Sequence, residues 1–422
     1  MARLTPFRAL RYDPAKAGSA RDLMAPPYDV IGREERARLA ARSPNNIVHV
    51  DLPAAAEGRT PAAEAARLLS RWREQGILRL DEAASLTWYR QEFDAPGGRR
   101  LTRRGFFGRL GLDLAGQGDV LPHERTFVKH VDERRALTQA TGVVLSPIFV
   151  LYTDPEGSAA AALEAAARGR EQVIEGHDGM RHAVSAVTEP GAVELARATI
   201  ARGPVVIADG HHRTQAARDY AAALGVKAGA DDQPAASLMT LFVRAEDPGV
   251  LILATHRLVR AGTERVARFL PWLGKHFAVL DVADAAAAAA ALTPAAGSFV
   301  AVTRAASVLV TAKPGHDPFA AHGLPPALAG ADYALVDEAV LGGALGVDVA
   351  ASAETGSVRY ERDAAAAVSA VKSGEADAAL LLPPTPVEVV FRVVKAGALL
   401  PRKSTYFQPK VPSGLLLDPM LP

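Results

Sequence analysis

Residues 205–225 limit the possible folds of this chain more than any other segment. The apolar residues 204–208 predict a short buried strand, and the alanine-rich residues 214–224 predict a helix. Asp209 and Gly210 lie between them, where a tight turn is expected. A strand that turns directly into a helix needs both kinds of structure in one fold. We therefore expect an α+β fold in which mixed sheets are packed with helices.

The turn combines several features that favour an anion. Gly210 can adopt backbone angles closed to other residues, and it lets a ligand approach the main chain. The first amides of the following helix, aided by the helix dipole, attract negative charge. His211, His212 and Arg213 add side-chain donors, and Thr214 follows them. We interpret Gly210, Arg213 and Thr214 as ligands of a cofactor's phosphates, and the two histidines as catalytic groups.

Asp209 places a carboxylate beside this anion site. Next to bound phosphates a carboxylate can hold magnesium, directly or through water, or accept a proton from an attacking hydroxyl. We therefore expect Asp209 to be a catalytic residue and the metal ligand. The alternative is that Asp209 caps the helix and that the histidines are surface groups with ordinary partners.

Two earlier segments also gather polar side chains. "APPYDVI" sets Tyr28 and Asp29 behind two prolines, and it could aim both side chains at a substrate or form a plain turn. "LPHERTF" places His123, Glu124 and Arg125 between apolar residues. Glu124 could accept the proton of a substrate hydroxyl, while His123 and Arg125 hold a carboxylate or phosphate. The alternative for this segment is an exposed polar turn.

The segment "PRKSTYFQPKVPSG" near the C-terminus cannot form a regular helix because prolines interrupt it. Lys403 and Lys410 stand on either side of Ser404 and Thr405. We expect Lys403 to contact the cofactor and the two hydroxyls to contact the substrate. A packed closing loop is the alternative.

Composition and order along the chain set further limits. The chain has 422 residues, enough for two or three domains, and we place a boundary between 1–245 and 246–422. In the first part, "NNIVHVDLP" predicts a short strand, and residues 85–113 predict a hairpin that turns at residues 96–98. Forty-eight basic and 47 acidic residues leave a formal charge of +1, which argues against nucleic acid as a partner.

Nothing in the sequence indicates a membrane or a secreted protein. No uncharged apolar stretch reaches the length of a bilayer span, and the first residues lack the pattern of a signal peptide. The absence of cysteine excludes thiolate metal sites and fits a reducing compartment. We expect a cytoplasmic protein, and the sequence leaves open whether it forms a homo-oligomer.

The motifs also resemble known families. "GHHRTQAA" is similar to the nucleotide-binding box of ParB and sulfiredoxin-like proteins, and "DGHHR" is closer still to the archaeal free-serine kinases of that superfamily. Over nearly the whole chain, the ordered motifs resemble the family called domain of unknown function 1015. They are "PFRALRY", "APPYDVI", "HERTF", "LSPIFVLY", "IADGHHRTQAA", "THRLV", "LLPPTP" and "KSTYFQPKVPSGL".

The resemblance implies a ParB/sulfiredoxin-like nucleotide-binding core elaborated by additional α/β segments. It also implies an activity, because some members of the family phosphorylate the hydroxyl of L-serine with ATP. Together with the residues above, it predicts an ATP- and Mg²⁺-dependent kinase for a small hydroxylated amino acid, with free L-serine as acceptor. The alternative is a nucleotide-binding regulatory or scaffold protein of ParB type that lacks kinase activity.

Overall fold

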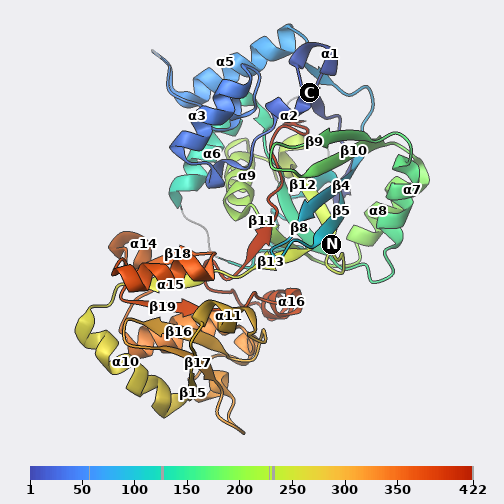
Figure 1. Ribbon diagram of the computed structural model, residues 1–422. Coiled ribbons are helices and arrows are strands. Elements are labelled where there is room, and N and C mark those ends of the chain that lie inside the picture. Colours follow the sequence, from blue (N-terminus) through green and yellow to red (C-terminus); the bar gives the residue numbers. More distant parts are fainter. Residues whose placement is uncertain (57, 125–127, 228, 231–232, 421–422) are drawn as a thin grey trace. The chain divides into compact units, whose positions relative to one another are not determined.

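A computed structural model describes residues 1–422 except 57, 125–127, 228, 231–232 and 421–422. Its contacts divide the chain into two compact units. The first unit comprises residues 1–122, 126–251 and 409–422, and the second comprises 123–125 and 252–408. Figure 1 shows the red C-terminal segment among the blue and green elements of the first unit.

The first unit is built on a mixed sheet in which the order is β6-β11-β8-β12-β5-β4-β10-β9, with β1 pairing to β5. The strands of this sheet are β1 (Leu4–Thr5), β4 (Leu86–Asp94), β5 (Arg100–Gly111), β6 (Val120–Leu121), β8 (Ile148–Tyr152), β9 (Gln172–Glu175), β10 (Arg181–Val187), β11 (Val205–Asp209) and β12 (Ser237–Arg244). Two short ladders accompany it, formed by β2 (Leu10–Tyr12) with β3 (Leu78–Leu80) and by β7 (Val143–Val144) with β21 (Asp418–Pro419).

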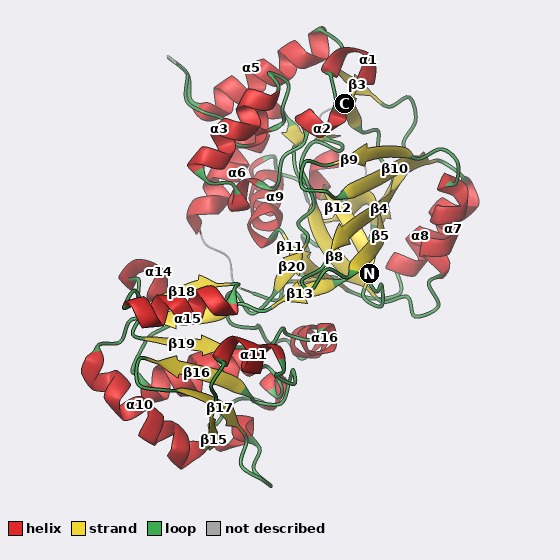
Figure 2. Cartoon of the chain, viewed as in Figure 1, coloured by secondary structure: helices red, strands yellow, loops and turns green. Residues whose placement is uncertain are grey.

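Helices cover both faces of this sheet (Figures 1 and 2). The helices of the first unit are α1 (Pro14–Ala17), α2 (Ala20–Leu23), the 3-10 turn η1 (Tyr28–Val30), α3 (Arg33–Arg42), α4 (Val48–Asp51), α5 (Pro61–Glu74), α6 (Val128–Thr141), α7 (Ser158–Ala167), α8 (Pro190–Ile200), α9 (His211–Ala223) and η2 (Pro234–Ala236). Helices α7 and α8 contact strands of the sheet on one side, and α9 packs on β8 and β12 with α6 and α5 outside it. The sheet therefore holds the start of α9 in a fixed place.

The second unit has its own antiparallel sheet, in the order β15-β17-β16-β19-β14-β18. Its strands are β13 (Leu251–Leu253), which pairs with β20 (Tyr406–Gln408), and β14 (His256–Val259), β15 (Ala278–Asp281), β16 (Phe299–Thr303), β17 (Ser307–Thr311), β18 (Val358–Glu361) and β19 (Ala378–Leu381). Its helices are α10 (Thr263–His276), α11 (Ala285–Ala290), α12 (Pro318–Ala321), η3 (Pro326–Leu328), α13 (Asp332–Ala334), the π-helical η4 (Leu335–Ala344), α14 (Ser352–Thr355), α15 (Ala364–Ser373) and α16 (Val387–Lys395).

The predicted mixture of sheets and helices is confirmed. The predicted hairpin is β4 and β5, which pair antiparallel across residues 95–99. The strand predicted in "NNIVHVDLP" is wrong, because Val48–Asp51 forms the helical turn α4. Helix α9 begins at His211, three residues earlier than predicted, because the turn at Gly210 needs no further residues.

The division into units differs from the predicted boundary between residues 245 and 246. The chain passes from the first unit to the second at residues 251 and 252, and residues 409–422 return to the first unit. This return is held by an ion pair between Arg109 and Asp418, with Nη2 and Oδ1 2.6 Å apart, and by the pairing of β21 with β7. A contact between residues so far apart leaves no local signal in the sequence.

Among the described residues, none of the helices combines the length and the apolar character needed to cross a bilayer.

Candidate functional site

The predicted turn exists, and its backbone depends on glycine. Strand β11 ends at Asp209, and Gly210 has a φ of +100°, a left-handed value that side-chain-bearing residues rarely adopt. A Cβ at this position would lie 2.6 Å from Cγ2 of Ile148, inside the first unit. The amide of Thr214 donates to the Gly210 carbonyl at 2.9 Å, and its hydroxyl donates to the same oxygen at 3.1 Å. Thr214 therefore stabilises the turn through its hydroxyl.

Asp209 lies between two cations. Nη2 of Arg213 donates to Oδ2 of Asp209 at 2.5 Å, and Nζ of Lys410 contacts Oδ1. Arg213 is buried and also donates to the carbonyl of Pro147. Burial opposes ionisation of Asp209, but the charges of Lys410 and Arg213 outweigh it and hold the pKa of the carboxyl well below its usual range. Asp209 is therefore ionised and paired.

This pairing argues against two of the predicted roles of Asp209. A carboxylate whose two oxygens already accept from cations is a weak proton acceptor, and a divalent metal would be repelled by Lys410 and Arg213. Among the described residues, no group of three His, Asp or Glu side chains could hold a metal ion. The residues beside Asp209 thus do not fit a resident magnesium ion, and the arrangement favours Asp209 as the residue that positions the two cations.

Both predicted histidines lie in the first turn of α9. His211 is buried, and its charge is among those that lower the pKa of Asp209 against the effect of burial, after the charges of Lys410 and Arg213. His212 is partly buried. The donors predicted from the sequence therefore lie on one helical turn.

Tyr28 and Asp29 share the surroundings of Arg213. Burial raises the pKa of Tyr28, and the charges of Arg213 and Arg134 oppose this. Cζ of Arg134 lies 3.9 Å from the centroid of the Tyr28 ring. Asp29 is exposed, and its charge helps to raise the pKa of Arg213 against the effect of burial, behind the larger contribution of Asp209. The structure thus brings the predicted "APPYDVI" and "DGHHR" residues to one region of the first unit.

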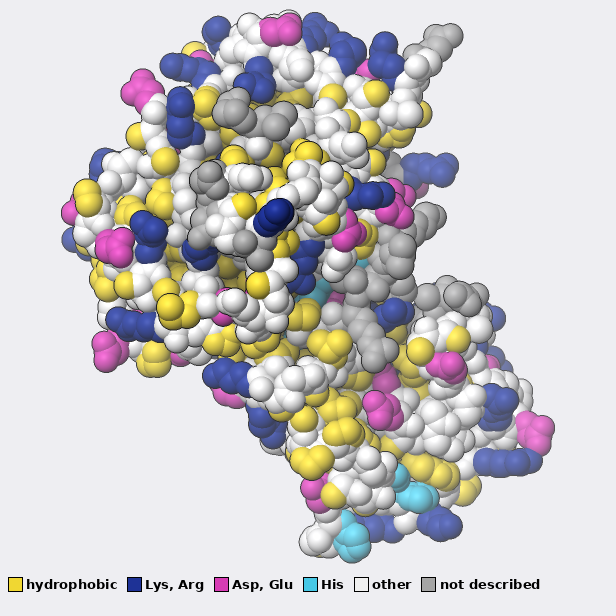
Figure 3. All heavy atoms as spheres, turned by 180° about the vertical axis from the view of Figure 1, so that it is seen from behind, with side chains coloured by type: hydrophobic (Ala, Val, Ile, Leu, Met, Phe, Trp, Pro, Cys, Tyr) yellow, Lys and Arg dark blue, Asp and Glu magenta, His cyan; other side chains and the backbone are white. Residues whose placement is uncertain are grey.

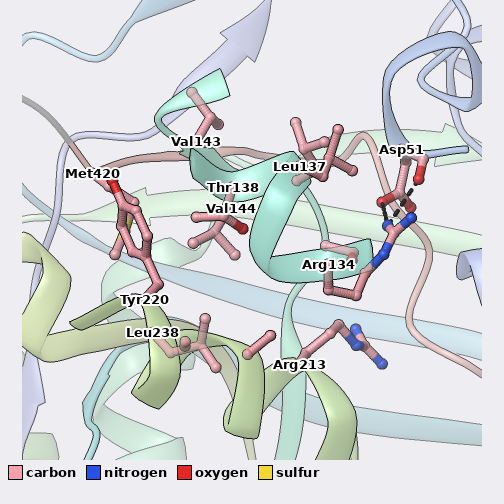
Figure 4. Close-up of a pocket in the computed structure, with 14 residues that line it drawn as sticks. Asp51, Arg134, Leu137, Thr138, Val143, Val144, Arg213, Tyr220, Leu238 and Met420 are labelled. Atoms are coloured by element: carbon pink, nitrogen blue, oxygen red, sulfur yellow. Dashed lines mark hydrogen bonds and ion pairs between the residues drawn. The ribbon is translucent and has the colours of Figure 1, made fainter. Parts of the chain in front are cut away.

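A small cavity of about 30 Å³ lies between α6 and α9 beside Arg213 (Figure 4). Arg134, from α6, lines it and donates through Nη1 to Oδ1 of Asp51 at 3.1 Å. This volume suits about one or two water molecules and not a nucleotide. The cavity is lined by both arginines but is too small to hold a nucleotide.

The remaining predicted residues gather in the second unit. Nε2 of His123 lies 2.6 Å from the Thr405 hydroxyl, and the amide of Lys403 donates to Oε2 of Glu124 at 3.3 Å. The Leu400 amide donates to the His123 carbonyl at 2.9 Å. The structure therefore joins the "LPHERTF" and "RKSTYF" segments, whose residues were predicted separately. Arg125 lies outside the described residues.

Ser404 and Lys403 differ in their exposure. Ser404 is buried, and its hydroxyl donates to the carbonyl of Pro401 at 2.6 Å. Lys403 has a left-handed backbone with a φ of +57° and an exposed side chain. Its carbonyl accepts from Nη1 of Arg257 at 3.0 Å. The loop is thus fixed by its own backbone contacts, as the prolines suggested, with Ser404 supporting it from inside.

Sequence reasoning missed several charged residues of the first unit. Lys410 was noted only as a flanking lysine, and Arg134, Asp51 and Arg103 were not considered. Each lies far in sequence from the residues it contacts, so only the folded chain brings them together. The proline-rich setting of Lys410 was the one available signal.

The fold and the first-unit site define a mixed α/β protein that presents buried cations at a strand–turn–helix junction. A family model matches residues 4–333, and the chain belongs to that family, which is described as "Protein of unknown function (DUF1015)". The family predicted from the motifs is thereby confirmed. No curated protein matches the sequence of this chain.

Solved structures with similar folds share little sequence with this chain. A conserved hypothetical protein from Pyrococcus furiosus is 16% identical, with a TM-score of 0.37 over 74% of this chain and 94% of its own. A free serine kinase in complex with AMP is 16% identical, with a TM-score of 0.37 over 72% and 86%. SbnI from Staphylococcus aureus is 11% identical, with a TM-score of 0.36 over 72% and 84%. Likenesses this distant carry no argument about the activity of this chain.

Proposed function

We propose that this protein is an ATP-dependent phosphotransferase that acts on the hydroxyl of a small metabolite, with free L-serine as the acceptor. The observation that carries the proposal is the junction of β11 and α9. There Gly210 opens the backbone, and Arg213 and Lys410 are held side by side on Asp209. Fixed cations beside a helix N-terminus suit the phosphates of a nucleotide.

The proposed reaction joins the acceptor's hydroxyl oxygen to the γ-phosphorus of ATP. The bond between that phosphorus and the β,γ-bridging oxygen breaks, ADP leaves, and the hydroxyl proton passes to a base. Catalysis of such a transfer depends mainly on positioning and electrostatics. In this proposal His211, His212, Arg213 and Lys410 offset the charge of the phosphates, and Asp209 keeps the cations in place.

Glu124 is the base in this proposal. Asp209 has both oxygens engaged with cations. Glu124, the other carboxylate that the sequence predicts as a base, is therefore the better proton acceptor.

Serine as the acceptor is supported by the resemblance of the Asp209 turn to the free-serine kinase motif. The other predicted substrate contacts are proposed to be His123, Arg125, Tyr28, Asp29 and Thr405, with Lys403 near the nucleotide and Ser404 supporting the loop. Because Asp209 does not fit a metal, magnesium is required only as the usual counter-ion of ATP, and no step passes through it. A kinase that draws on ATP and free amino acids would work in the cytoplasm, as the sequence predicts.

The test is to incubate the pure protein with ATP, Mg²⁺ and a panel of hydroxylated amino acids. Formation of O-phosphoserine together with ADP is the expected result. Binding of ATP or CTP without any phosphorylated acceptor would replace this proposal with the nucleotide switch of ParB type.

Two variants test the assigned roles. Glu124→Gln removes the base and should lower kcat by about 10²-fold or more with little change in ATP affinity. Asp209→Asn removes the carboxylate that positions Arg213 and Lys410, so it should weaken ATP binding as well as turnover. Unchanged kcat in a folded Glu124→Gln protein would remove Glu124 from the mechanism, and Glu133→Gln, on α6, serves as the matched control.

A further inference from the structure

Arg103 is a buried cation that the proposed chemistry does not use. It lies on β5 with 1% of its surface exposed. Its Nη2 donates to Oε1 of Gln91 at 2.5 Å and to the carbonyl of Pro409 at 2.8 Å, and its Nε has no hydrogen-bond partner. No carboxylate among the described residues forms an ion pair with Arg103. Burying a charge that forms no ion pair is costly, so the presence of Arg103 at this place needs an explanation.

The residue that Arg103 holds directly precedes Lys410. The Pro409 carbonyl is fixed by Arg103, and Lys410 then reaches Asp209. The rest of this segment is also anchored in the first unit. The Ser413 hydroxyl donates to Oδ2 of Asp51 at 2.7 Å, and Asp418 is fully buried against Arg109. These contacts therefore fix the backbone on both sides of Lys410, although Lys410 is distant in sequence from Asp209.

The Asp209 carboxylate contacts two cations, Arg213 and Lys410. Arg103 lies nearby, and the charges of Tyr89, Asp247 and Asp209 favour its ionised form. A phosphate chain is a multiply charged anion of the kind that lysine and arginine side chains bind.

We infer that Lys410 is a phosphate-binding residue whose ammonium exchanges Asp209 for the nucleotide's phosphates, and that Arg103 is the positioning residue that fixes it. The C-terminal segment at residues 409–422 thereby completes the nucleotide site of the first unit. This inference rests on the proposed function for the identity of the nucleotide. It adds that Lys410 binds the phosphates and that the segment 409–422 holds Lys410 in place.

Lys410→Met tests the inference, and Lys372→Met is the control because Lys372 is an exposed lysine on α15 that has no role in the proposed site. Affinities for ATP and for inorganic tripolyphosphate are measured by calorimetry on the full chain. Lys410→Met should weaken both by about tenfold or more, Lys410→Arg should recover part of the loss, and Lys372→Met should change tripolyphosphate affinity by less than about threefold. Asp209 keeps Arg213 in Lys410→Met, so the fold should persist, and circular dichroism checks this.

Arg103 is tested through its dependence on Lys410. Arg103→Met should weaken tripolyphosphate binding in the wild-type background, but it should add little in a Lys410→Met background. A purely structural role would instead lower affinity equally in both backgrounds. Arg103→Met is compared with the wild-type protein at the same folded fraction, so that a loss of stability is not read as a loss of affinity.

The outcomes separate this inference from the proposed function. If the wild-type protein binds ATP but phosphorylates no acceptor, and Lys410→Met loses that binding, the kinase fails and the inference holds. If Lys410→Met binds tripolyphosphate as tightly as wild type, the inference is overturned whether or not serine is phosphorylated. If the wild-type protein binds neither ATP nor tripolyphosphate, both are rejected.

Discussion

Gly210 meets two separate demands at the start of α9. Its φ of +100° excludes most side chains, and the space where a Cβ would stand is occupied by Ile148. Gly225, just beyond the end of the same helix, also has a left-handed φ of +69° but has open space around its Cβ position. Comparing alanine substitutions at the two glycines therefore separates the cost of a left-handed backbone from the cost of a steric overlap.

Gly225→Ala should lower the free energy of unfolding by about 1 kcal/mol, which is the usual cost of a left-handed alanine. Gly210→Ala should cost about 2 kcal/mol more, because Ile148 and the strand beneath it must move. Denaturant titration of both variants measures this difference. Equal losses would mean that the contact with Ile148 relaxes freely, and the turn would not be as rigid as described.

His256 makes the second unit sensitive to acid. It is buried, and its Nδ1 accepts from the Leu382 amide at 3.1 Å, so the ring must be neutral at that nitrogen. Burial, and then the charge of Arg257, lower the pKa of His256 to about 4, while Glu361 and Asp363 oppose this. Between pH 6.5 and 4 the unfolded chain therefore takes up a proton that the folded chain refuses, so stability falls as the pH falls.

His256→Asn keeps an acceptor near Nδ1 but does not titrate. The wild-type protein should lose about 3 kcal/mol more stability than this variant between pH 7 and pH 4. Urea titrations followed through Trp272, which lies in the second unit, measure both. Other histidines lie on the surface of that unit (Figure 3), and they act equally in both proteins. Parallel pH profiles would show that His256 takes up its proton in the folded chain as readily as in the unfolded chain, and its pKa would not be lowered.

At the scale of elements, the sequence predicted what is local. The hairpin β4–β5 follows from its alternation and turn residues. Helix α4 was missed because a long-range contact overrides the β-propensity of its valines. Asn46 accepts from the Val48 amide at 2.9 Å, and its own amide donates to the carbonyls of Asp22 and Met24.

In the candidate site too, the sequence predicted the residues that are adjacent in the chain and missed the contacts between distant residues. Asp209, Gly210 and Arg213 could be found because one strand, one turn and one helix supply them in consecutive order. The pairing of Asp209 with Lys410 joins residues 201 positions apart, and no local pattern encodes it. The sequence did not show that both oxygens of Asp209 contact cations, an arrangement that disfavours its predicted roles as base and metal ligand.

At the scale of the whole molecule, the C-terminal segment links the end of the chain to the first unit's core. Leu417 is 1% exposed and belongs to the same apolar cluster as Leu10 and Trp72. Its amide and carbonyl both bond to Leu10 at 2.9 Å. The stability of the first unit should therefore depend on residues 409–422.

The three tryptophans allow each unit to be followed separately. Trp72 and Trp88 are buried in the first unit, and Trp272 lies in the second. A Trp272→Phe background reports on the first unit, and a Trp72→Phe, Trp88→Phe background reports on the second. Leu381, buried in the second unit's apolar cluster, provides the matched position for Leu417.

Leu417→Ala should lower the free energy of unfolding reported by Trp72 and Trp88 by about 2–5 kcal/mol, the usual cost of emptying a buried leucine site. It should change the Trp272 transition much less, while Leu381→Ala should have the opposite pattern. The reason is that each unit has its own core, so a cavity in one core weakens the contacts of that core first. If Leu417→Ala moved the Trp272 transition as far as the other, the C-terminal segment would not belong to the first unit, and the support it gives to Lys410 would have to come from elsewhere.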